Sequence, residues 1–510
     1  MKRRTIFTAL LLLTVALTSS ATDTIRQRGC RVGKPNPQFA PHRAPALQSG
    51  ENPYVGSRRQ LVVLASFQDQ DFAEDHETTL LTWNKIFNAE NYAEGMYVGS
   101  VRDYFLAQSY GQFDLTFDLM LVELPDGRSK YRSTSYDDEN SQFMVDDIVD
   151  VLQTHDIDWS LYDWDGDTFV DQLLIVYAGK GMNAGGDSNT IWPHQWWLSQ
   201  HLDMEQQGTD VYRSYRTVAN GDEEYYIDCY CCVQEVVNLS DTKTSFGTIC
   251  HEYSHCFGLP DFYYGNYSVL HNWDVMDYGL YNGMGFRPCN YSAHERMLMG
   301  WLTPTELTSG ITITDMPALV DEPKAYLIRN DGEENEYYIV ENRQQRGWDE
   351  QLPGSGIIIF HVDYDEDIWE NTNNIPNGYS KKRYHIFAAN NKKNKSASGE
   401  WGYPYIETDG EGNENVANDE LTNTSAPAAT LNNPNVDGQK LMSKPITQMR
   451  VDADGLASFV FMDGETTDIK DNKRETATDH HWFAIDGRQL LGKPTVHGLY
   501  FHGGQKVVIK

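Results

Sequence analysis

Residues 251–261 read His251-Glu252-Tyr253-Ser254-His255-Cys256-Phe257-Gly258-Leu259-Pro260-Asp261. Residues four positions apart share one face of an α-helix, so His251 and His255 can bind one ion while Glu252 faces the open side of that ion. Two imidazoles beside a carboxylate base are typical of a catalytic zinc site, where the metal lowers the pKa of its water to about 7. The stretch therefore predicts a zinc-binding helix and zinc-dependent hydrolysis.

A third zinc ligand is expected soon after the helix. Gly258 and Pro260 both weaken or end a helix, so the chain can turn back and bring Asp261 to the metal. The alternative is a carboxylate on a later helix, such as Glu295 in the stretch Ala-His-Glu-Arg-Met over residues 293–297. Gly258 favours Asp261, because it places a turn directly after the second histidine.

A second motif follows over residues 272–279, which read Asn-Trp-Asp-Val-Met-Asp-Tyr-Gly. Together with the zinc motif it resembles the metzincin zinc peptidases, in which a turn carries a methionine beneath the metal. The resemblance implies that Met276 is this methionine and that Tyr278 stabilises the oxyanion of the tetrahedral intermediate. The alternative for both residues is ordinary core packing by a thioether and a phenol.

Within that group the chain is most similar to the immune inhibitor A family of secreted zinc metallopeptidases. Matching stretches occur at residues 61–64, 100–105, 191–194, 251–261, 291–293, 300–302, 336–343 and 356–363. The resemblance covers about residues 59–465. It implies an α/β (α+β) metzincin-like catalytic domain over residues 59–305 and an antiparallel β-sandwich-like domain over residues 306–465.

Hydrophobic patterns give the same outline. Residues 61–67 and 173–177 read as buried strands, and residues 101–109 and 143–152 as amphipathic helices. Further on, the apolar runs at 337–340 and 357–360 are separated by Pro353-Gly354, which favours antiparallel strands. Residues 466–510 are expected to form a linker and a short C-terminal β tail that resembles the sorting tails of secretion-system cargo; a small structural hairpin is the alternative.

The N-terminus has the pattern of a targeting signal. Residues 1–21 combine basic residues, a short apolar run and small residues, as in a signal peptide, and no later run is long enough for a transmembrane anchor. Residues 22–58 contain five prolines and are predicted to be a pro-segment or leader. Around Cys30 this leader resembles the latency segment of matrix metallopeptidases, which implies that Cys30 is a latency ligand for the zinc. We expect a secreted, extracellular or cell-surface protein.

A calcium site is expected before the strand at 173–177. Asp163, Asp165, Asp167 and Asp171 occupy positions 1, 3, 5 and 9 of a potential Ca²⁺ loop. The loop is not an EF-hand, because position 6 is Thr168 rather than glycine and position 12 is not acidic. Four clustered carboxylates repel one another unless a cation lies between them. The alternative is a solvated acidic turn.

Seven cysteines fit an oxidising compartment, and six of them cluster in sequence near the zinc motif: Cys229, Cys231, Cys232, Cys250, Cys256 and Cys289. On one helix Cys250 and Cys256 would lie about 9 Å apart, beyond disulfide reach. The prediction is that the 229–232 segment is stapled by disulfides to the helix and to Cys289. A redox or second metal site at the C-x-x-C of residues 229–232 is the competing interpretation.

Charge narrows the range of partners. Lys and Arg number 41 against 74 Asp and Glu, so the net charge is -33, which opposes binding to nucleic acid or anionic membranes. Two functions remain. The first is a zinc endopeptidase acting on protein or peptide substrates, with Zn²⁺ and Ca²⁺ as cofactors and Glu252 as general base. The alternative is a surface adhesion or matrix-binding protein in which the zinc domain is ancillary.

Overall fold

The computed structural model describes residues 52–464, apart from 134–139, 201–214, 238–243, 264–266, 366–367, 370–375, 379–380 and 392–400. In the tail it describes residues 482–484, 489–490, 493, 498–502 and 505–509. The expected signal peptide, nearly all of the leader with Cys30, and most of the linker lie outside the described residues. The fold is mixed α/β, as the sequence predicts.

A five-stranded sheet organises residues 52–304, which contain the motif predicted to be catalytic and are called the catalytic half for that reason, in the order β2-β1-β4-β8-β5. Its strands are β1 (Gly56–Ser66), β2 (Phe113–Glu123), β4 (Leu173–Lys180), β8 (Cys229–Val236) and β5 (His194–Trp197). All neighbours are parallel except β5, which runs antiparallel to β8. The consecutive apolar residues 61–65 of β1 are all buried, as expected where both faces of a parallel sheet are covered. A smaller sheet, β3-β7-β6, joins Phe169–Val170, Glu223–Ile227 and Arg216–Asn220.

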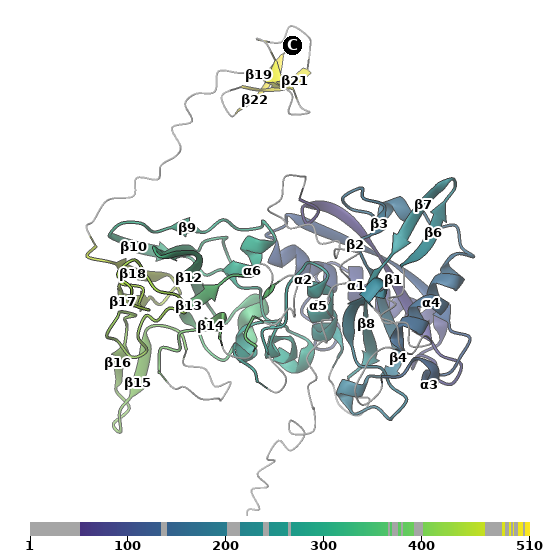
Figure 1. Ribbon diagram of the computed structural model, residues 1–510, viewed down its shortest axis with the longest axis horizontal. Coiled ribbons are helices and arrows are strands. Elements are labelled where there is room, and N and C mark those ends of the chain that lie inside the picture. Colours follow the sequence, from purple (N-terminus) through teal and green to yellow (C-terminus); the bar gives the residue numbers. More distant parts are fainter. Residues whose placement is uncertain are drawn as a thin grey trace, which may run out of the picture.

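Six α-helices occur in the described residues: α1 (His76–Asn88), α2 (Val101–Gln108), α3 (Arg128–Tyr131), α4 (Ser141–Leu152), α5 (Phe246–His255) and α6 (Ala293–Leu298). The predicted helices near residues 101–109 and 143–152 are thus confirmed as α2 and α4. α2 begins at a capping box, in which Ser100 and Asp103 satisfy each other's backbone N–H groups. Figure 1 shows α2 and α5 between the two large sheets of the molecule.

A second five-stranded sheet, β14-β13-β12-β11-β9, organises residues 305–464, called the β-rich half. Its strands are β9 (Thr305–Glu306), β11 (Tyr326–Asn330), β12 (Glu333–Arg343), β13 (Gly356–Asp363) and β14 (Tyr384–Ile386). β12 and β13 pair antiparallel, as predicted. A three-stranded sheet packs against it in the order β10-β18-β17, from Ile311–Met316, Ala457–Phe461 and Ile446–Val451. The hairpin of β15 (Tyr405–Thr408) and β16 (Glu414–Asn418) stands apart.

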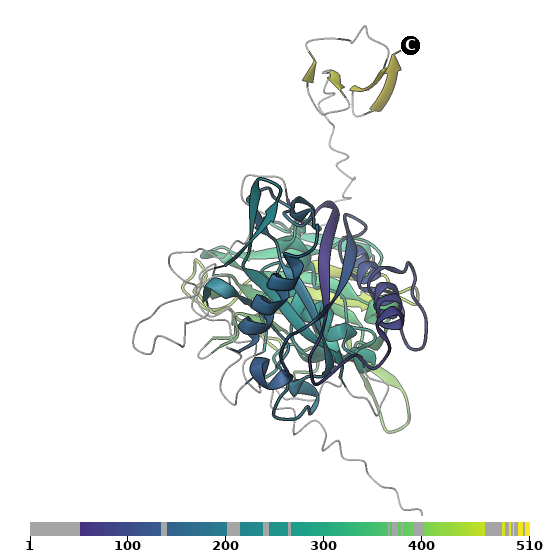
Figure 2. The same cartoon turned by 90° about the vertical axis from the view of Figure 1, so that its right-hand side faces the viewer.

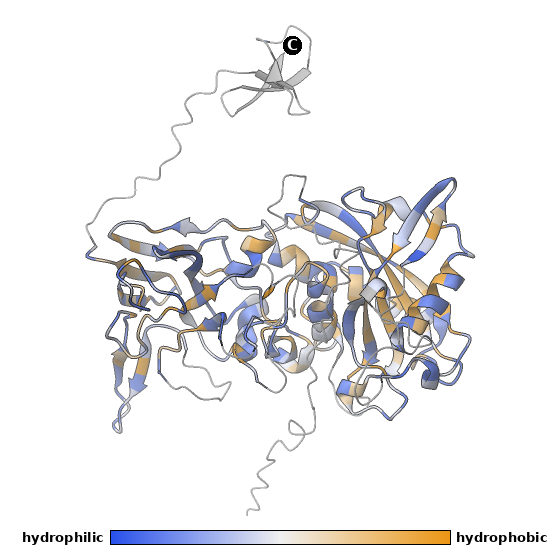
Figure 3. Cartoon of the chain, viewed as in Figure 1, coloured by the Kyte–Doolittle hydropathy of each residue, from blue (hydrophilic) through white to orange (hydrophobic). Residues whose placement is uncertain are grey.

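The sheet around β12 and β13 is buried on both faces. Ile357 and Ile359 of β13 belong to the core shared with the three-stranded sheet, whereas Ile358 and Phe360 belong to the core of the catalytic half. Alternate residues of a strand point to opposite faces, so one strand contributes to both cores. Figure 3 shows apolar residues concentrated on the central strands, and Figure 2, turned so that the catalytic half faces the viewer, shows the twist of its sheet. The two halves are therefore continuous through the interior.

Buried polar contacts also join the halves. Arg343 of β12 donates two hydrogen bonds to Asp349, at 2.8 and 2.7 Å, and contacts Glu341 at 3.1 Å. Glu341 in turn accepts a hydrogen bond from the backbone N–H of Ala293, at the start of α6. All three charged side chains are fully buried, so each carboxylate depends on Arg343 for neutralisation.

The C-terminal tail forms a four-stranded antiparallel sheet, β20-β19-β21-β22, from Gln489–Leu490, Trp482–Ala484, Gly498–His502 and Gln505–Ile509. Throughout the described residues, every helix is too short or too polar to cross a bilayer.

Candidate metal centre

The helix α5 carries the zinc motif and is buried along its whole length. It ends at His255, and the chain reverses at Gly258, whose φ of +89° lies in the region that glycine adopts without steric cost. The N–H of Gly258 donates to the carbonyl of His255 at 2.9 Å, which closes the turn. This reversal sends residues 259–261 back along the histidine face of α5, as Gly258 predicts.

Asp261 lies between the two imidazoles. Its Oδ1 is 3.2 Å from Nε2 of His251 and 3.3 Å from Nε2 of His255, and all three side chains are at most 3% exposed. In a tetrahedral zinc site with ligands about 2.0–2.1 Å from the metal, two ligand atoms lie about 3.3 Å apart. The three atoms therefore have the spacing of three ligands around one zinc ion.

Backbone carbonyls fix the orientation of both histidines. Nδ1 of His251 lies 2.8 Å from the carbonyl oxygen of Val275, and Nδ1 of His255 lies 2.7 Å from that of Leu259. Because a carbonyl oxygen only accepts, each Nδ1 must carry the proton and donate it. The lone pair of each neutral ring is then on Nε2, the atom that faces Asp261, as a metal ligand requires.

The charges of the site call for a cation at this point. Burial alone would lower the pKa of His251, but the contact with Asp261 and the charge of Glu252 raise it to about 9. Burial would raise the pKa of Asp261, yet His255 and His251 lower it to about 2. Both shifts favour a positive charge on the His251 imidazole beside an anionic Asp261 carboxylate. A zinc ion would supply that positive charge, so the residues fit the metal.

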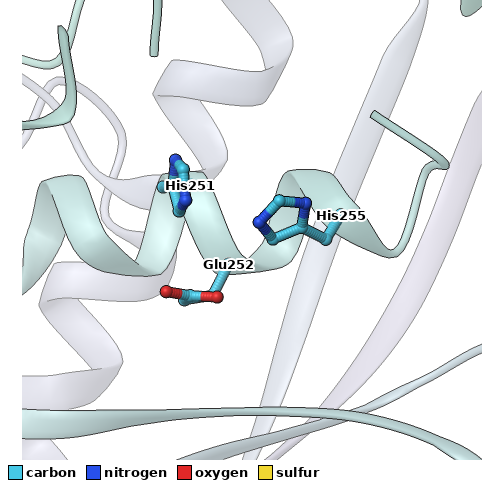
Figure 4. Close-up of side chains that lie close together, drawn as sticks. All are labelled: His251, Glu252 and His255. Atoms are coloured by element: carbon cyan, nitrogen blue, oxygen red, sulfur yellow. The ribbon is translucent and has the colours of Figure 1, made fainter. Parts of the chain in front are cut away.

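Glu252 is the candidate base. It is 4% exposed, and one of its oxygens lies within 4.8 Å of ligand atoms of His251 and His255. Figure 4 shows its carboxylate projecting from α5 at the level of His251, below the two imidazoles in this view. Glu252 and His251 also line a small cavity together with Tyr263 and Tyr278. The carboxylate thus faces space that a substrate group can enter.

The methionine turn packs against α5. Met276 is fully buried, and its N–H donates to Oδ1 of Asp274 at 2.8 Å. The same turn presents the Val275 carbonyl to His251, so the turn supports a predicted ligand directly. Tyr278 follows at the cavity wall and is half-buried, with its ring centroid 6.4 Å from that of Tyr263.

Two further residues are placed by the fold. Glu295, the alternative third ligand, closes the capping box of α6, where its carboxylate accepts the N–H of Ser292 at 2.6 Å.

Tyr263, which sequence reasoning missed, stacks on His251 with ring centroids 6.2 Å apart. Its only sequence signal is its position two residues after Asp261, because nothing in an isolated tyrosine distinguishes a site residue from core.

Three of the four aspartates predicted to bind calcium lie close together. Asp163, Asp165 and Asp167 bring one oxygen each within 4.8 Å of one another, a group that does not include Asp171. Asp171 accepts the N–H of Trp164 at 2.6 Å, and burial, together with the charges of the other three, raises its pKa well above the usual range. Asp165, Asp167 and Asp171 line one small cavity with Asp228, which the sequence pattern missed because it lies on a different segment.

The predicted disulfide staple is not formed in the structure. No disulfide joins any two of the six cysteines near α5, and Sγ of Cys229 is 3.9 Å from Sγ of Cys256, about twice an S–S bond length. The 229–232 segment does lie beside the helix, as expected. Cys289 has a different environment, because its sulfur packs where a side chain at Gly279 would be.

The C-x-x-C interpretation meets a geometric obstacle. Residues three apart on a strand point to opposite faces of the sheet. Cys229 of β8 faces Cys256, whereas Sγ of Cys232 lies 3.5 Å from Nδ1 of His194. Cys229 and Cys232 therefore do not form one thiol pair.

The region that contains this site is similar to known proteins. Residues 60–300 match the family model described as immune inhibitor A peptidase M6, catalytic domain. The chain is also similar to immune inhibitor A of Bacillus thuringiensis subsp. alesti, at 24% identity over 298 residues, which is 50% of this chain and 41% of that protein. The chain thus matches about two fifths of the length of this curated relative. The similarity to the immune inhibitor A family indicated by the sequence motifs is confirmed.

Proposed function

We propose that this chain, whose residues 60–300 are similar to M6 peptidase catalytic domains, is a secreted zinc endopeptidase of the metzincin type. The observation that carries the proposal is the position of one Asp261 oxygen within 3.3 Å of Nε2 of both His251 and His255. The ligands come from one short segment, and the base Glu252 lies on the same helix. This arrangement is suited to hydrolysis of a peptide bond.

His251, His255 and Asp261 would hold the zinc, which when bound polarises the substrate carbonyl and lowers the pKa of a water molecule. Glu252 takes the proton of the attacking water and delivers it to the leaving amine, so that one carboxylate acts first as base and then as acid. The hydroxyl of Tyr278 donates a hydrogen bond to the oxygen that becomes negative in the transition state. The Val275 and Leu259 carbonyls keep both imidazoles in the ligating tautomer.

Supporting roles follow for other segments. We infer that Ca²⁺ binds to Asp163, Asp165 and Asp167, near Asp171, because burial and the three neighbouring acids otherwise disfavour the charged form of Asp171. Met276 supports the ligand helix from the turn below it. The leader, with Cys30 as latency ligand, keeps the enzyme inactive before processing, and the C-terminal tail is addressed to secretion machinery.

The direct test compares the wild type with Glu252→Ala on casein, with and without a chelator. The proposal expects activity to fall by at least 1,000-fold, on the order of the loss of a catalytic base, while the purified variant still contains zinc. Equal casein cleavage by both proteins would overturn the peptidase assignment. The adhesion alternative instead expects matrix binding that is unchanged by Glu252→Ala and by the chelator.

A further inference from the structure

A large cleft lies between the catalytic half and the β-rich half, away from the acidic loop. Its volume is about 720 Å³, within the range of specific ligand sites. One wall is formed by residues 267–269 and 271 of the catalytic half. The other walls come from residues 382, 385–388, 391, 401, 425–428 and 430 of the β-rich half. Neither half forms this cleft alone.

The lining differs in character from the rest of the chain. Trp401, Phe387, Val269 and Pro427 supply apolar surface, and Lys382 supplies a positive charge. Among the described residues no carboxylate lines the cleft, although the chain has 74 acidic side chains. Polar side chains such as Ser268, Asn391 and Thr430 also line the cleft, and its aromatic and aliphatic side chains together offer a contact surface for an apolar side chain. The absence of acidic groups also removes the repulsion that a negatively charged polypeptide would meet elsewhere on this protein.

Asp277, which follows Met276, connects the wall of the cleft to the predicted zinc site. Its buried carboxylate accepts the N–H groups of Val269, Leu270 and His271 at 2.9, 2.8 and 3.2 Å, and so fixes the wall formed by residues 268–271. Asp277 also lines the cavity that contains Glu252. The same residue therefore positions both the turn beneath the predicted ligands and the nearer wall of the cleft.

Aromatic rings lead from the zinc site into the cleft. The ring centroids of Tyr278 and His271 lie 6.3 Å apart, and those of His271 and Trp401 lie 5.4 Å apart. An extended chain rises about 3.3 Å per residue, so about four residues of substrate span the part of this path from Tyr278, which lines the cavity with Glu252, to Trp401. A substrate held at Glu252 therefore reaches the cleft close to the bond that is cleaved.

We propose that this cleft is a substrate subsite that takes a large apolar, preferably aromatic, side chain of the polypeptide within about four residues of the cleaved bond. The proposal rests on the proposed peptidase function. It assigns to the β-rich half a part in specificity, through Trp401 and Phe387, in addition to its structural contact with the catalytic half.

The test uses quenched fluorescent peptides with one cleavable bond, in which phenylalanine replaces alanine at one position at a time over four positions on each side. The wild type is expected to show kcat/KM raised at least 10-fold by phenylalanine at one position outside the two residues that flank the bond. Ala428→Trp, which fills the cleft, should abolish this preference and leave cleavage of the all-alanine peptide within twofold. Val436→Trp, at a site that is 75% exposed and outside the cleft, is the matched control and should keep the preference.

The outcomes separate this proposal from the function on which it rests. If the wild type cleaves none of the peptides, the peptidase function itself fails. If the wild type cleaves the peptides but Ala428→Trp keeps the preference for phenylalanine, the subsite proposal is wrong and the peptidase function stands. The same holds if Ala428→Trp lowers cleavage of the all-alanine peptide as much as that of the phenylalanine peptide. Ala426→Leu, a smaller filling change, should reduce the preference part-way and gives the answer if Ala428→Trp does not fold. Unchanged peptide rates with weaker binding of a synthetic leader peptide would make the leader the occupant and overturn the subsite.

Discussion

His251 and Val275 are joined by a hydrogen bond of 2.8 Å, in which Nδ1 of the imidazole donates to the backbone carbonyl. The contact links the zinc helix to the methionine turn 24 residues later in the chain. In the neutral ring it leaves Nε2 of His251, the atom that faces Asp261, as the unprotonated nitrogen, so the turn determines the tautomer of a predicted ligand. The site is therefore made by a helix, the reversal after it and a turn that supports both.

Gly258→Ala tests the reversal without removing a ligand. A φ of +89° costs an alanine about 1–2 kcal/mol, which the chain can relieve by moving Asp261 away from the histidines. We expect zinc affinity to fall about 10-fold, measured by competition with a chromogenic chelator. Gly410→Ala is the control, because its added methyl group meets open space. The zinc affinity of this variant should equal that of the wild type.

Tyr278→Phe removes the proposed hydrogen bond to the oxyanion and keeps the ring. Because this bond strengthens in the transition state, kcat should fall about 10- to 100-fold while KM and zinc content stay near those of the wild type. Steady-state kinetics on a single peptide separate the two constants. An unchanged kcat would make Tyr278 a wall residue of the cavity only.

His294 predicts a loss of stability in acid. Burial lowers its pKa to about 3, against 6.5 in the unfolded chain, so the unfolded state binds the extra proton first as the pH falls. Stability is present above pH 6.5 and is lost progressively down to about pH 3, amounting to about 2 kcal/mol at pH 5. Urea unfolding at pH 8 and pH 5 measures this loss. His294→Phe should shrink the difference by that amount, and an identical difference in both proteins would contradict the assignment.

Arg343→Met tests the buried charges that join the halves. The change leaves Glu341 and Asp349 without their cation in the interior, so the free energy of unfolding should drop by about 3–5 kcal/mol. Arg450→Met breaks an ion pair with Asp419 in which the arginine is 51% exposed, and it should cost less than about 1 kcal/mol. Equal losses of unfolding free energy in the two variants would mean that the buried charges stabilise the fold no more than an exposed ion pair does.

The sequence predicts those parts that depend on local spacing. The i, i+4 histidines and the turn at Gly258 lie within eleven residues, so helix geometry and the reversal after the helix together bring Asp261 to the imidazoles. The unbroken apolar run at 61–65 and the alternation around Ile357 and Ile359 likewise reflect the periods of buried and two-faced strands. In each case the determining contacts are near in sequence or repeat with a fixed period.

The remaining features depend on long-range packing. Asp228 reaches the acidic loop, and Trp401 reaches His271, from segments whose separation in sequence gives no hint of contact. The disulfide prediction was wrong for this structure for the same reason, since proximity in sequence did not place the sulfurs at bonding distance. The middle sheet shared by two cores also could not be inferred, because a strand pattern does not reveal which core each face joins.

The measurement that tests the account most directly is anomalous diffraction at the zinc absorption edge from crystals of the purified protein. We predict one peak within about 2.2 Å of Nε2 of His251, Nε2 of His255 and a carboxylate oxygen of Asp261, with one open position facing Glu252. A zinc ion bound by the two histidines and another donor, with Asp261 turned away, would contradict the metzincin-type site. The absence of a peak at the histidines in active protein would contradict the zinc mechanism.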